Sequence, residues 1–172
     1  MPPVIRPTIP ADQFPLLSLA KETGVFKPIE LDALEEVLND YHATNHAHGH
    51  RSVTYEDGGE PLGFAYYAPA AMTDHTWYLY WIAVTKQTQA RGIGGKLLKF
   101  AEDDIRQRHG RILLIETSST PHYELTRRFY LKQEYEQAAV IPDYYADGDS
   151  MVVFRKRLSS SQIPSPSGRR SG

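Results

Sequence analysis

The chain has 172 residues, a formal net charge of −2 and no cysteine. Its length suits one domain with a substantial core, and 41% hydrophobic with 23% charged residues argues against general disorder. The charge gives no electrostatic reason to expect a nucleic-acid partner, and the absence of cysteine excludes disulfides, thiolate nucleophiles and cysteine zinc sites. The start of the chain lacks the apolar run of a signal peptide, and no stretch approaches the ~20 apolar residues of a membrane helix. We therefore expect no membrane partner and a cytoplasmic location.

Hydrophobic periodicity predicts both strands and helices in the first half of the chain. Strands are expected where aromatic and β-branched residues gather, and helices where apolar residues recur at helical spacing. Asp57–Glu60 predicts a hairpin turn, because Asp-Gly and Gly-Gly tolerate positive φ. The predicted order is a strand, two helices and three strands, at Val4–Ile9, Ala11–Glu22, Glu30–Tyr41, Arg51–Glu56, Leu62–Pro69 and Thr76–Val84.

The second half alternates between helix and strand. Thr120 followed by Pro121 has the pattern of an N-cap and a first helical residue. The predicted elements are a helix, a central apolar strand, a helix and a last strand, at Gly94–Gln107, Arg111–Thr117, Pro121–Leu131 and Ser150–Leu158. The order β-α-α-β-β-β-α-β-α-β predicts an α/β domain with a mixed sheet over residues 3–158. Ser159–Gly172, rich in Ser, Pro and Gly, is predicted to be a disordered tail, because it cannot offset its ordering entropy by burial.

A glycine-rich segment lies between the aromatic strand and the helix that follows it. Glycines let the backbone approach a ligand, and a helix start offers free N–H groups and a positive dipole end, which together suit a pyrophosphate. A Walker A loop is excluded, because Ala90 and Leu97 stand where its first glycine and its hydroxyl residue belong. A dinucleotide fingerprint fails because Leu97 takes the place of its third glycine. The pattern Gln-x-x-Gly-x-Gly fits at Gln89, Gly92 and Gly94.

This pattern resembles the pyrophosphate loop of the GNAT superfamily of N-acetyltransferases. The aromatic strand before the loop, the helix with Leu97 and Leu98, the apolar strand Ile112–Thr117 and the segment Arg128–Tyr135 follow the family order. The resemblance implies the GNAT acyltransferase fold, acetyl-CoA as the acyl-donor substrate, and acetyl transfer to a primary amine by direct attack in a ternary complex without a metal. It also makes a homodimer an expectation. The acceptor stays open between small-molecule and peptide amines, and a non-catalytic CoA-binding regulatory module is the alternative function.

The resemblance implies that backbone groups hold most of the acyl donor. Ile82, Ala83 and Val84 would pair with the pantetheine amides in a slot where their strand splays from its neighbour, and N–H groups there would polarise the thioester carbonyl. Arg91 and Lys96 would add charge, or are solvated surface residues. The pyrophosphate would lie on the N–H groups of Gln89, Ala90, Arg91, Gly92, Ile93, Gly94 and Gly95.

Two residues are candidates for the chemistry. Tyr130 matches the family tyrosine that meets the thioester sulfur, and a phenol with a pKa of about 10 can protonate a leaving thiolate. The alternative for Tyr130 is a half-buried aromatic residue. Glu116 interrupts an apolar strand near the expected slot, which suits a general base acting directly or through water. The alternative for Glu116 is a hydrogen-bonded glutamate that holds the loop after it.

Other positions stay open. Tyr123 stands where the family often has an asparagine, so that contact is not carried over. Arg127 and Arg128 would reach a CoA phosphate, or they are charged residues of the surface. The acidic segment Asp143–Asp149 predicts Tyr144, Tyr145 and Asp149 as binding residues for a cationic amine, or an acidic turn. The histidines between His42 and His50 could bind a metal, border the acceptor or form a polar loop.

Overall fold

The computed structural model describes residues 2–159, without the side chains of Gln89 and Ala90. The predicted tail therefore lies, apart from Ser159, outside the described residues. None of the described helices is long and apolar enough to cross a membrane. The strands are β1 (Val4–Pro7), β2 (Arg51–Asp57), β3 (Glu60–Pro69), β4 (Thr76–Val84), β5 (Ile112–Ser118), β6 (Glu136–Ala146) and β7 (Asp149–Arg157). The α-helices are α1 (Gln13–Glu22), α2 (Pro28–Ala43), α3 (Ile93–Gln107) and α4 (Glu124–Lys132).

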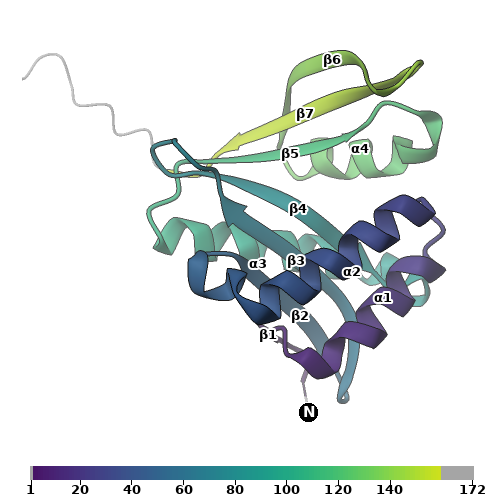
Figure 1. Ribbon diagram of the computed structural model, residues 1–172, viewed down its shortest axis with the longest axis vertical. Helices are drawn as coiled ribbons and strands as arrows, with labels where there is room; N and C mark the ends of the chain where they lie inside the picture. Colours follow the sequence, from purple (N-terminus) through teal and green to yellow (C-terminus); the bar gives the residue numbers. More distant parts are fainter. Residues whose placement is uncertain (1, 160–172) are drawn as a thin grey trace, which may run out of the picture.

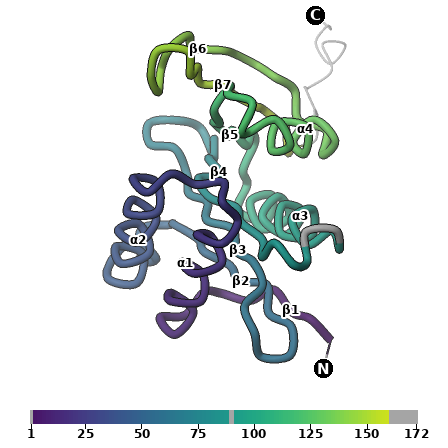
Figure 2. The backbone as a smooth tube through the Cα atoms, turned by 90° about the vertical axis from the view of Figure 1, so that its right-hand side faces the viewer, coloured from purple at the N-terminus to yellow at the C-terminus, as the bar shows by residue number. Residues whose placement is uncertain are grey.

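The strands form one mixed sheet in the order β1-β2-β3-β4-β5-β7-β6. Only β4 and β5 run parallel to each other; every other neighbouring pair is antiparallel. Helices α1 and α2 lie on one face of the sheet and α3 on the other (Figures 1 and 2). The predicted mixed α/β class is confirmed.

Each face of the sheet has its own hydrophobic core. On one face, Leu16, Leu34 and Leu38 of α1 and α2 are buried against Phe64 and Tyr66 of β3. On the other face, α3 buries its apolar side against the sheet and α4, namely Ile93, Leu97, Leu98, Ala101 and Ile105. Burial of large apolar side chains is the main favourable term in folding, so these two cores fix the helices on the sheet.

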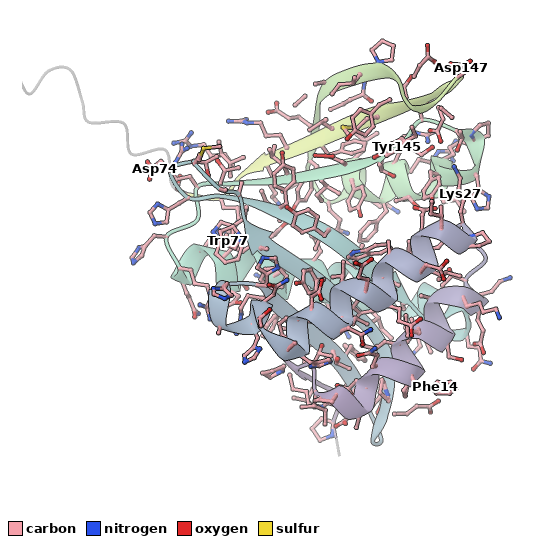
Figure 3. All side chains as sticks on the ribbon, in the orientation of Figure 1. Phe14, Lys27, Asp74, Trp77, Tyr145 and Asp147 are labelled. Atoms are coloured by element: carbon pink, nitrogen blue, oxygen red, sulfur yellow. The ribbon has the colours of Figure 1, made fainter. Side chains whose placement is uncertain are left out.

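Strand β6 was missing from the predicted order, which was wrong at this point. Two features of this segment are unusual for a strand. Pro142 lacks an N–H donor, and Asp143 has a φ of 53° in the structure. The ladder with β7 is interrupted between Ile141 and Ala146. A strand at the edge of a sheet tolerates such features, and they blunt the edge against pairing with other chains. The segment Asp143–Asp149 is thus the end of β6, a turn and the start of β7, with Asp147 at the tip of the hairpin (Figure 3).

A β-bulge divides β4 into two parts. Tyr67 of β3 pairs with Leu79 and Tyr66 pairs with Trp81, so Tyr80 is an extra residue in β4. A bulge bends its strand and increases the local twist. Before the bulge, Trp77 and Leu79 pack into the α3 core; after it, Trp81 and Ala83 pack with the α1–α2 core.

The strands β4 and β5 separate at the same point. Their parallel ladder runs from Thr76 opposite Ile112 to Leu79 opposite Ile115. Among the described residues no further pair joins them, although β4 continues to Val84 and β5 to Ser118. The two strands are therefore joined up to Leu79 and Ile115 and separated beyond them. The candidate site lies in this opening.

Candidate active site

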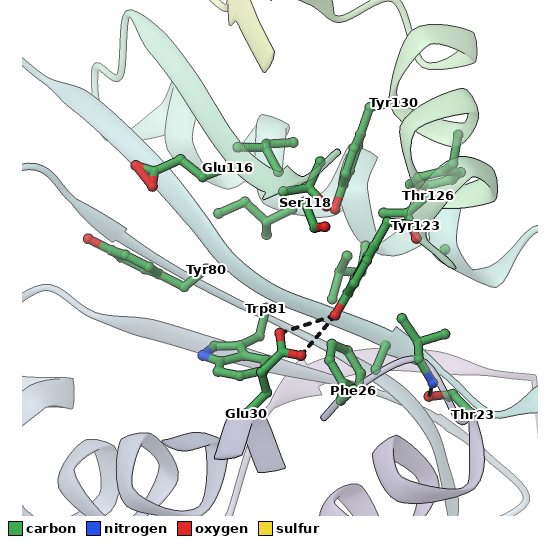
Figure 4. Close-up of a pocket in the computed structure, with 18 of the residues that line it drawn as sticks. Thr23, Phe26, Glu30, Tyr80, Trp81, Glu116, Ser118, Tyr123, Thr126 and Tyr130 are labelled. Atoms are coloured by element: carbon green, nitrogen blue, oxygen red, sulfur yellow. Dashed lines mark hydrogen bonds between the residues drawn. The ribbon is translucent and has the colours of Figure 1, made fainter. Parts of the chain in front are cut away.

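A cleft of about 1100 Å³ occupies the opening between β4 and β5. Its walls come from β4, the end of β5, helix α4 and the segment that joins α1 to α2, and the start of α3 and the β6–β7 arm also line it. Figure 4 shows Tyr130 entering from α4, Glu116 from β5 and Glu30 from the start of α2. The cleft thus collects polar side chains from elements far apart in the sequence.

The glycine-rich turn forms one end of the cleft. Gly92, with a φ of 73°, is the residue before α3, and no described side chain caps the helix there. The first N–H groups of a helix lack partners within the helix. A Cβ at Gly94 would lie 3.5 Å from Phe129 Cζ, and one at Gly95 would lie 3.4 Å from Gln133 Nε2. Glycine therefore keeps the space between α3 and α4 open beside free N–H donors, an arrangement suited to an anion.

The predicted donor-binding residues divide into two groups. Six of them line the cleft: Ile82, Ala83, Val84, Gly92, Gly94 and Gly95.

The side chains of the other predicted donor-binding residues lie outside the cleft or are not described. Ile93 is buried in the α3 core. Arg91 is exposed and its Nη2 lies 3.3 Å from Asp57 Oδ2. Lys96 borders a separate hollow beside β1. The backbone of Gln89 and Ala90 belongs to the 3-10 turn Lys86–Arg91. For this group, the sequence prediction now concerns backbone N–H groups and not side-chain charge.

Tyr130 lies at the centre of the cleft wall. The residue is only 4% exposed, and its ring packs 5.4 Å from Phe129 and 5.5 Å from Phe154 between centroids. Burial raises the pKa of its hydroxyl well above the usual range. No described group hydrogen-bonds this hydroxyl, and the residue lines the cleft. Tyr130 is therefore a protonated donor directed at whatever occupies the cleft.

Glu116 follows directly on the last β4–β5 pair and lines the cleft, with its carboxyl group on the side of Tyr80 (Figure 4). The residue is exposed toward the cleft, yet partial burial raises its carboxyl pKa, and the nearby Tyr78 hydroxyl offsets part of this shift. Other residues hold the loop after β5. Ser118 Oγ donates to Asp149 Oδ1 at 2.5 Å, and Arg127 Nη1 donates to the carbonyls of Ser118 and Thr120 at 2.8 Å. Ser118 and Arg127 thus hold this loop, which is the role that the alternative interpretation gave to Glu116.

The remaining end of the cleft is acidic and aromatic. Tyr123 Oη donates to both carboxylate oxygens of Glu30, at 2.9 and 3.2 Å. Lys27 Nζ lies 3.4 Å from Asp149 Oδ2. Figure 3 shows Tyr145 on the β6–β7 arm and Lys27 at the start of α2, on the two sides of the cleft.

Two of the three predicted acceptor residues line this end. Asp149 is buried and Tyr145 reaches the cleft, whereas Tyr144 is 57% exposed and lies outside the lining. Alternation along β6 explains the difference, because successive side chains point to opposite faces of a strand. Burial and nearby carboxylates, Glu116 first, raise the pKa of Tyr145 to about 12.

Sequence reasoning missed Phe26, Lys27 and Glu30 as site residues. Glu30 carries a local signal, since its carboxylate accepts from the Lys27 backbone N–H at 2.9 Å in a capping box. That signal marks a helix start and says nothing about a cleft. Their place in the site depends on Tyr123, 93 positions away from Glu30, which no local pattern reports.

The histidine tract lies apart from the cleft, and none of its histidines lines it. His46 Nδ1 lies 2.8 Å from the Tyr41 carbonyl, and His50 Nδ1 lies 2.6 Å from Tyr66 Oη. In the described part of the chain, no three His, Cys, Asp or Glu side chains gather closely enough to hold a metal ion. These contacts give His46 and His50 structural roles at the end of α2.

Comparison with known proteins places this fold and cleft in one family. The model of the acetyltransferase (GNAT) family matches residues 16–135. An uncharacterised N-acetyltransferase of Methanocaldococcus jannaschii is 30% identical over 86 residues, covering 48% of this chain and 53% of that protein. The chain therefore matches about half the length of this curated relative.

Solved structures agree with this placement. A GNAT-family protein from Desulfovibrio desulfuricans is 31% identical, with a TM-score of 0.88 over 92% of this chain and 100% of that chain. The yncA protein of Salmonella typhimurium, solved with its cofactor acetyl-CoA, is 15% identical with a TM-score of 0.73 over 96% of this chain and 99% of that chain, and it supports the fold alone. The splayed strands, the glycine turn before α3 and the match over residues 16–135 lead to the same conclusion: the chain belongs to the GNAT family of acetyltransferases.

Proposed function

We propose that this protein transfers an acetyl group from acetyl-CoA to a primary amine by direct attack in a ternary complex. One observation carries the proposal: a single cleft joins the uncapped glycine turn of α3 to the buried hydroxyl of Tyr130 and the carboxyl group of Glu116. Membership of the GNAT family of acetyltransferases, matched over residues 16–135, supports acetyl-CoA as the donor.

The described residues fit the acyl donor. The free N–H groups at the start of α3 would hold the pyrophosphate, and Gly94 and Gly95 leave room for it where a side chain would approach α4. The part of β4 beyond the β5 ladder, Ile82–Val84, borders the cleft and would bind the pantetheine arm along its backbone. When bound, acetyl-CoA supplies the acetyl group and a thiolate leaving group.

The chain's own residues divide the proton chemistry between two walls of the cleft. Glu116 accepts a proton from the ammonium form of the acceptor, directly or through water, because its raised pKa makes it a stronger base than an ordinary carboxylate. The amine nitrogen then forms the new bond to the acetyl carbon as the carbon–sulfur bond breaks, and it releases its second proton, which replaces the one that Tyr130 gives to the sulfur. Tyr130 Oη donates its proton to the departing sulfur, and burial of the phenol keeps that proton in place until then.

The first experiment is calorimetric titration with acetyl-CoA, followed by thiol release over a panel of amines. Binding with thiol release for one class of amine supports the proposal and identifies the acceptor as a small molecule or a peptide. Binding without release over the panel favours a CoA-binding regulatory module. No binding contradicts the donor site at Gln89–Lys96. Sedimentation of the same sample tests the expected homodimer.

A further inference from the structure

The acceptor end of the cleft carries uncompensated negative charge. Its described lining includes three carboxylates, Glu30, Glu116 and Asp149, but only one lysine, Lys27. Lys27 is already paired with Asp149, which also accepts from Ser118. Neither Glu30 nor Glu116 forms an ion pair with any described residue. Two carboxylates thus face the same space without a protein cation, Glu30 half-buried and Glu116 exposed toward the cleft.

Glu30 is fixed in position by neutral donors. Tyr123 Oη and the Lys27 backbone N–H donate to it at 2.9 Å, which orients the carboxylate and leaves its charge in place. A carboxylate has about four acceptor positions, so Glu30 keeps capacity toward the cleft. In Figure 4, Glu30 lies on the lower wall and Glu116 on the upper wall.

Tyr145 lines the cleft together with these three carboxylates. Burial raises the pKa of Tyr145 to about 12, with smaller contributions from Glu116, Tyr144, Asp149 and Glu30. The unpartnered hydroxyl of Tyr130, in a residue that is 4% exposed, reaches this cleft from α4. This hydroxyl has no protein partner among the described residues and is open to the cleft, so it can donate to a ligand there.

Aromatic faces line the acidic end as well. Phe26 and Trp81 lie 5.6 Å apart between ring centroids, and both border the cleft beside Glu30 (Figure 4). Tyr78 and Tyr80 stack at 5.5 Å on the adjoining part of β4. Tryptophan and tyrosine faces attract cations through their quadrupoles. Carboxylates and aromatic faces together favour a ligand that is positively charged and partly apolar.

We infer that the acceptor is a small amine carrying a second cationic group, of the diamine or polyamine class. This inference rests on the proposed function and specifies its substrate. One amine meets Glu116, loses a proton to it and receives the acetyl group. The second ammonium stays charged and is held by Glu30 beside Phe26 and Trp81. An amino acid of similar length would bring its carboxylate to Glu30, and repulsion disfavours it.

The test compares three ligands of matched length: putrescine, butylamine and 4-aminobutanoate. Their binding is measured by calorimetry, both on the free protein and on the protein saturated with CoA. Putrescine should bind at least about tenfold more tightly than butylamine, and 4-aminobutanoate more weakly than both, because only putrescine gains an ion pair without repulsion. Thiol release from acetyl-CoA is recorded with each ligand.

Variants locate the second ammonium. Glu30→Gln should reduce the preference for putrescine to less than about threefold while butylamine binding stays unchanged. Glutamine can keep the capping box of α2, so the fold is retained. Glu35→Gln, which removes an exposed carboxylate of α2 outside the cleft lining, is the matched control and should keep the full preference.

The outcomes separate the two proposals. Equal binding of putrescine and butylamine, no putrescine binding, or a preference that survives Glu30→Gln overturns the inference and leaves the acetyltransferase proposal standing if another amine releases thiol. A Glu30-dependent preference for putrescine without acetyl-CoA binding would leave the diamine site standing and contradict the acetyltransferase proposal, and with it the role of the diamine as acceptor.

Discussion

Aromatic rings surround the side chain of Tyr130 and set its chemistry. Phe129, Tyr135 and Phe154 lie 5.4, 6.1 and 5.5 Å from its ring centroid. This packing holds the hydroxyl in a fixed direction and keeps it protonated by excluding water. The fixed direction serves a proton donor, whereas the raised pKa makes the phenol a weaker acid that gives up its proton only to a strong base such as a departing thiolate.

We predict that Tyr130→Phe lowers kcat about 100-fold and leaves the Kd for acetyl-CoA unchanged. The ring still fills its place, and no protein hydrogen bond is lost, so Tm should not fall. Steady-state thiol release and calorimetry measure the two effects. A variant with a near-normal kcat at neutral pH would exclude the acid role.

Glu116 predicts a pH dependence of catalysis. A general base must be ionised, so kcat/KM should fall as the pH falls through the pKa of Glu116. Partial burial places that pKa above the ordinary value of a glutamate, and Tyr78, which lies close to the carboxyl group, offsets part of the shift. Glu116→Gln should lower kcat/KM about 100-fold and remove this acidic limb from the profile. If the limb is the same in Glu116→Gln, another group carries it.

Asp12 links stability to pH. Arg6 donates to its two carboxylate oxygens at 2.7 and 2.9 Å, and the Ile9 N–H donates at 2.9 Å. Burial acts to raise the pKa of Asp12, but these hydrogen bonds outweigh it and the pKa is lowered. Stability from this group is therefore present above the unfolded-state pKa and is lost as the pH falls through the folded-state pKa.

We predict that Asp12→Asn destabilises the protein at pH 7 by about 1–3 kcal/mol. The difference from the unmodified protein should shrink in acid, where Asp12 is protonated in both states. Denaturant unfolding at the two pH values measures both free energies. A difference that does not depend on pH would show that Asp12 acts through packing and not through its charge.

At the scale of elements, periodicity predicted what local sequence controls. The bounds of β4 were confirmed in full, and the helix predicted at Gly94–Gln107 begins one residue earlier, at Ile93. Strand β6 was missed because Pro142 and Asp143 argue against a strand, and only pairing with β7 overrides them. The bulge at Tyr80 has no local signal either, since it depends on how β3 and β4 align.

The glycine turn before α3 gives a prediction with a matched control. Gly92 and Gly148 have φ values of 73° and 81°, and a Cβ at either would meet no atom within 4 Å. Alanine at either position should therefore cost similar stability, about 1–2 kcal/mol, from backbone strain alone. We expect only Gly92→Ala to weaken acetyl-CoA binding, because Gly148 lies in the β6–β7 turn. Equal binding by both variants would remove the turn from the donor site.

On the scale of the whole molecule, the cleft divides the sheet into two arms, which the shared core around α3 joins on one face. The parallel ladder of β4 and β5 has four pairs. Across the open end, His122 Nε2 lies 3.0 and 3.1 Å from the carbonyls of Gly24 and Val25, and Tyr123 bonds to Glu30. The segment between α1 and α2 thus contacts the turn before α4 across the cleft.

We predict that Tyr123→Phe loosens this connection. Losing a hydrogen bond to a carboxylate costs about 1.5–3 kcal/mol where the carboxylate is left without it. Amide hydrogen exchange of residues 24–30 should accelerate, and KM for the acceptor should rise, while the Kd for acetyl-CoA stays the same. Unchanged exchange in this segment would show that the remaining contacts hold it alone.

The same division explains what the sequence could say about the site. Its donor end follows the chain from β4 into α3, so the motif at Gln89, Gly92 and Gly94 predicted it. Its acceptor end is assembled by contacts between distant segments, such as Tyr123 with Glu30 and Lys27 with Asp149. Those contacts follow from the packing of the two arms, and no spacing within the sequence encodes them.

At Tyr80, the extra residue in β4, the presence of a residue and the identity of that residue have different consequences. Trp77 and Leu79 serve one core and Trp81 and Ala83 the other. A strand without Tyr80 would keep both assignments, because Leu79 and Trp81 would then be neighbours that point to opposite faces, as their partners Tyr67 and Tyr66 do. Tyr80 itself is 53% exposed at the edge of the cleft. Its deletion should therefore leave both cores in register and remove the bend where β4 leaves β5, whereas its substitution changes only the acceptor wall.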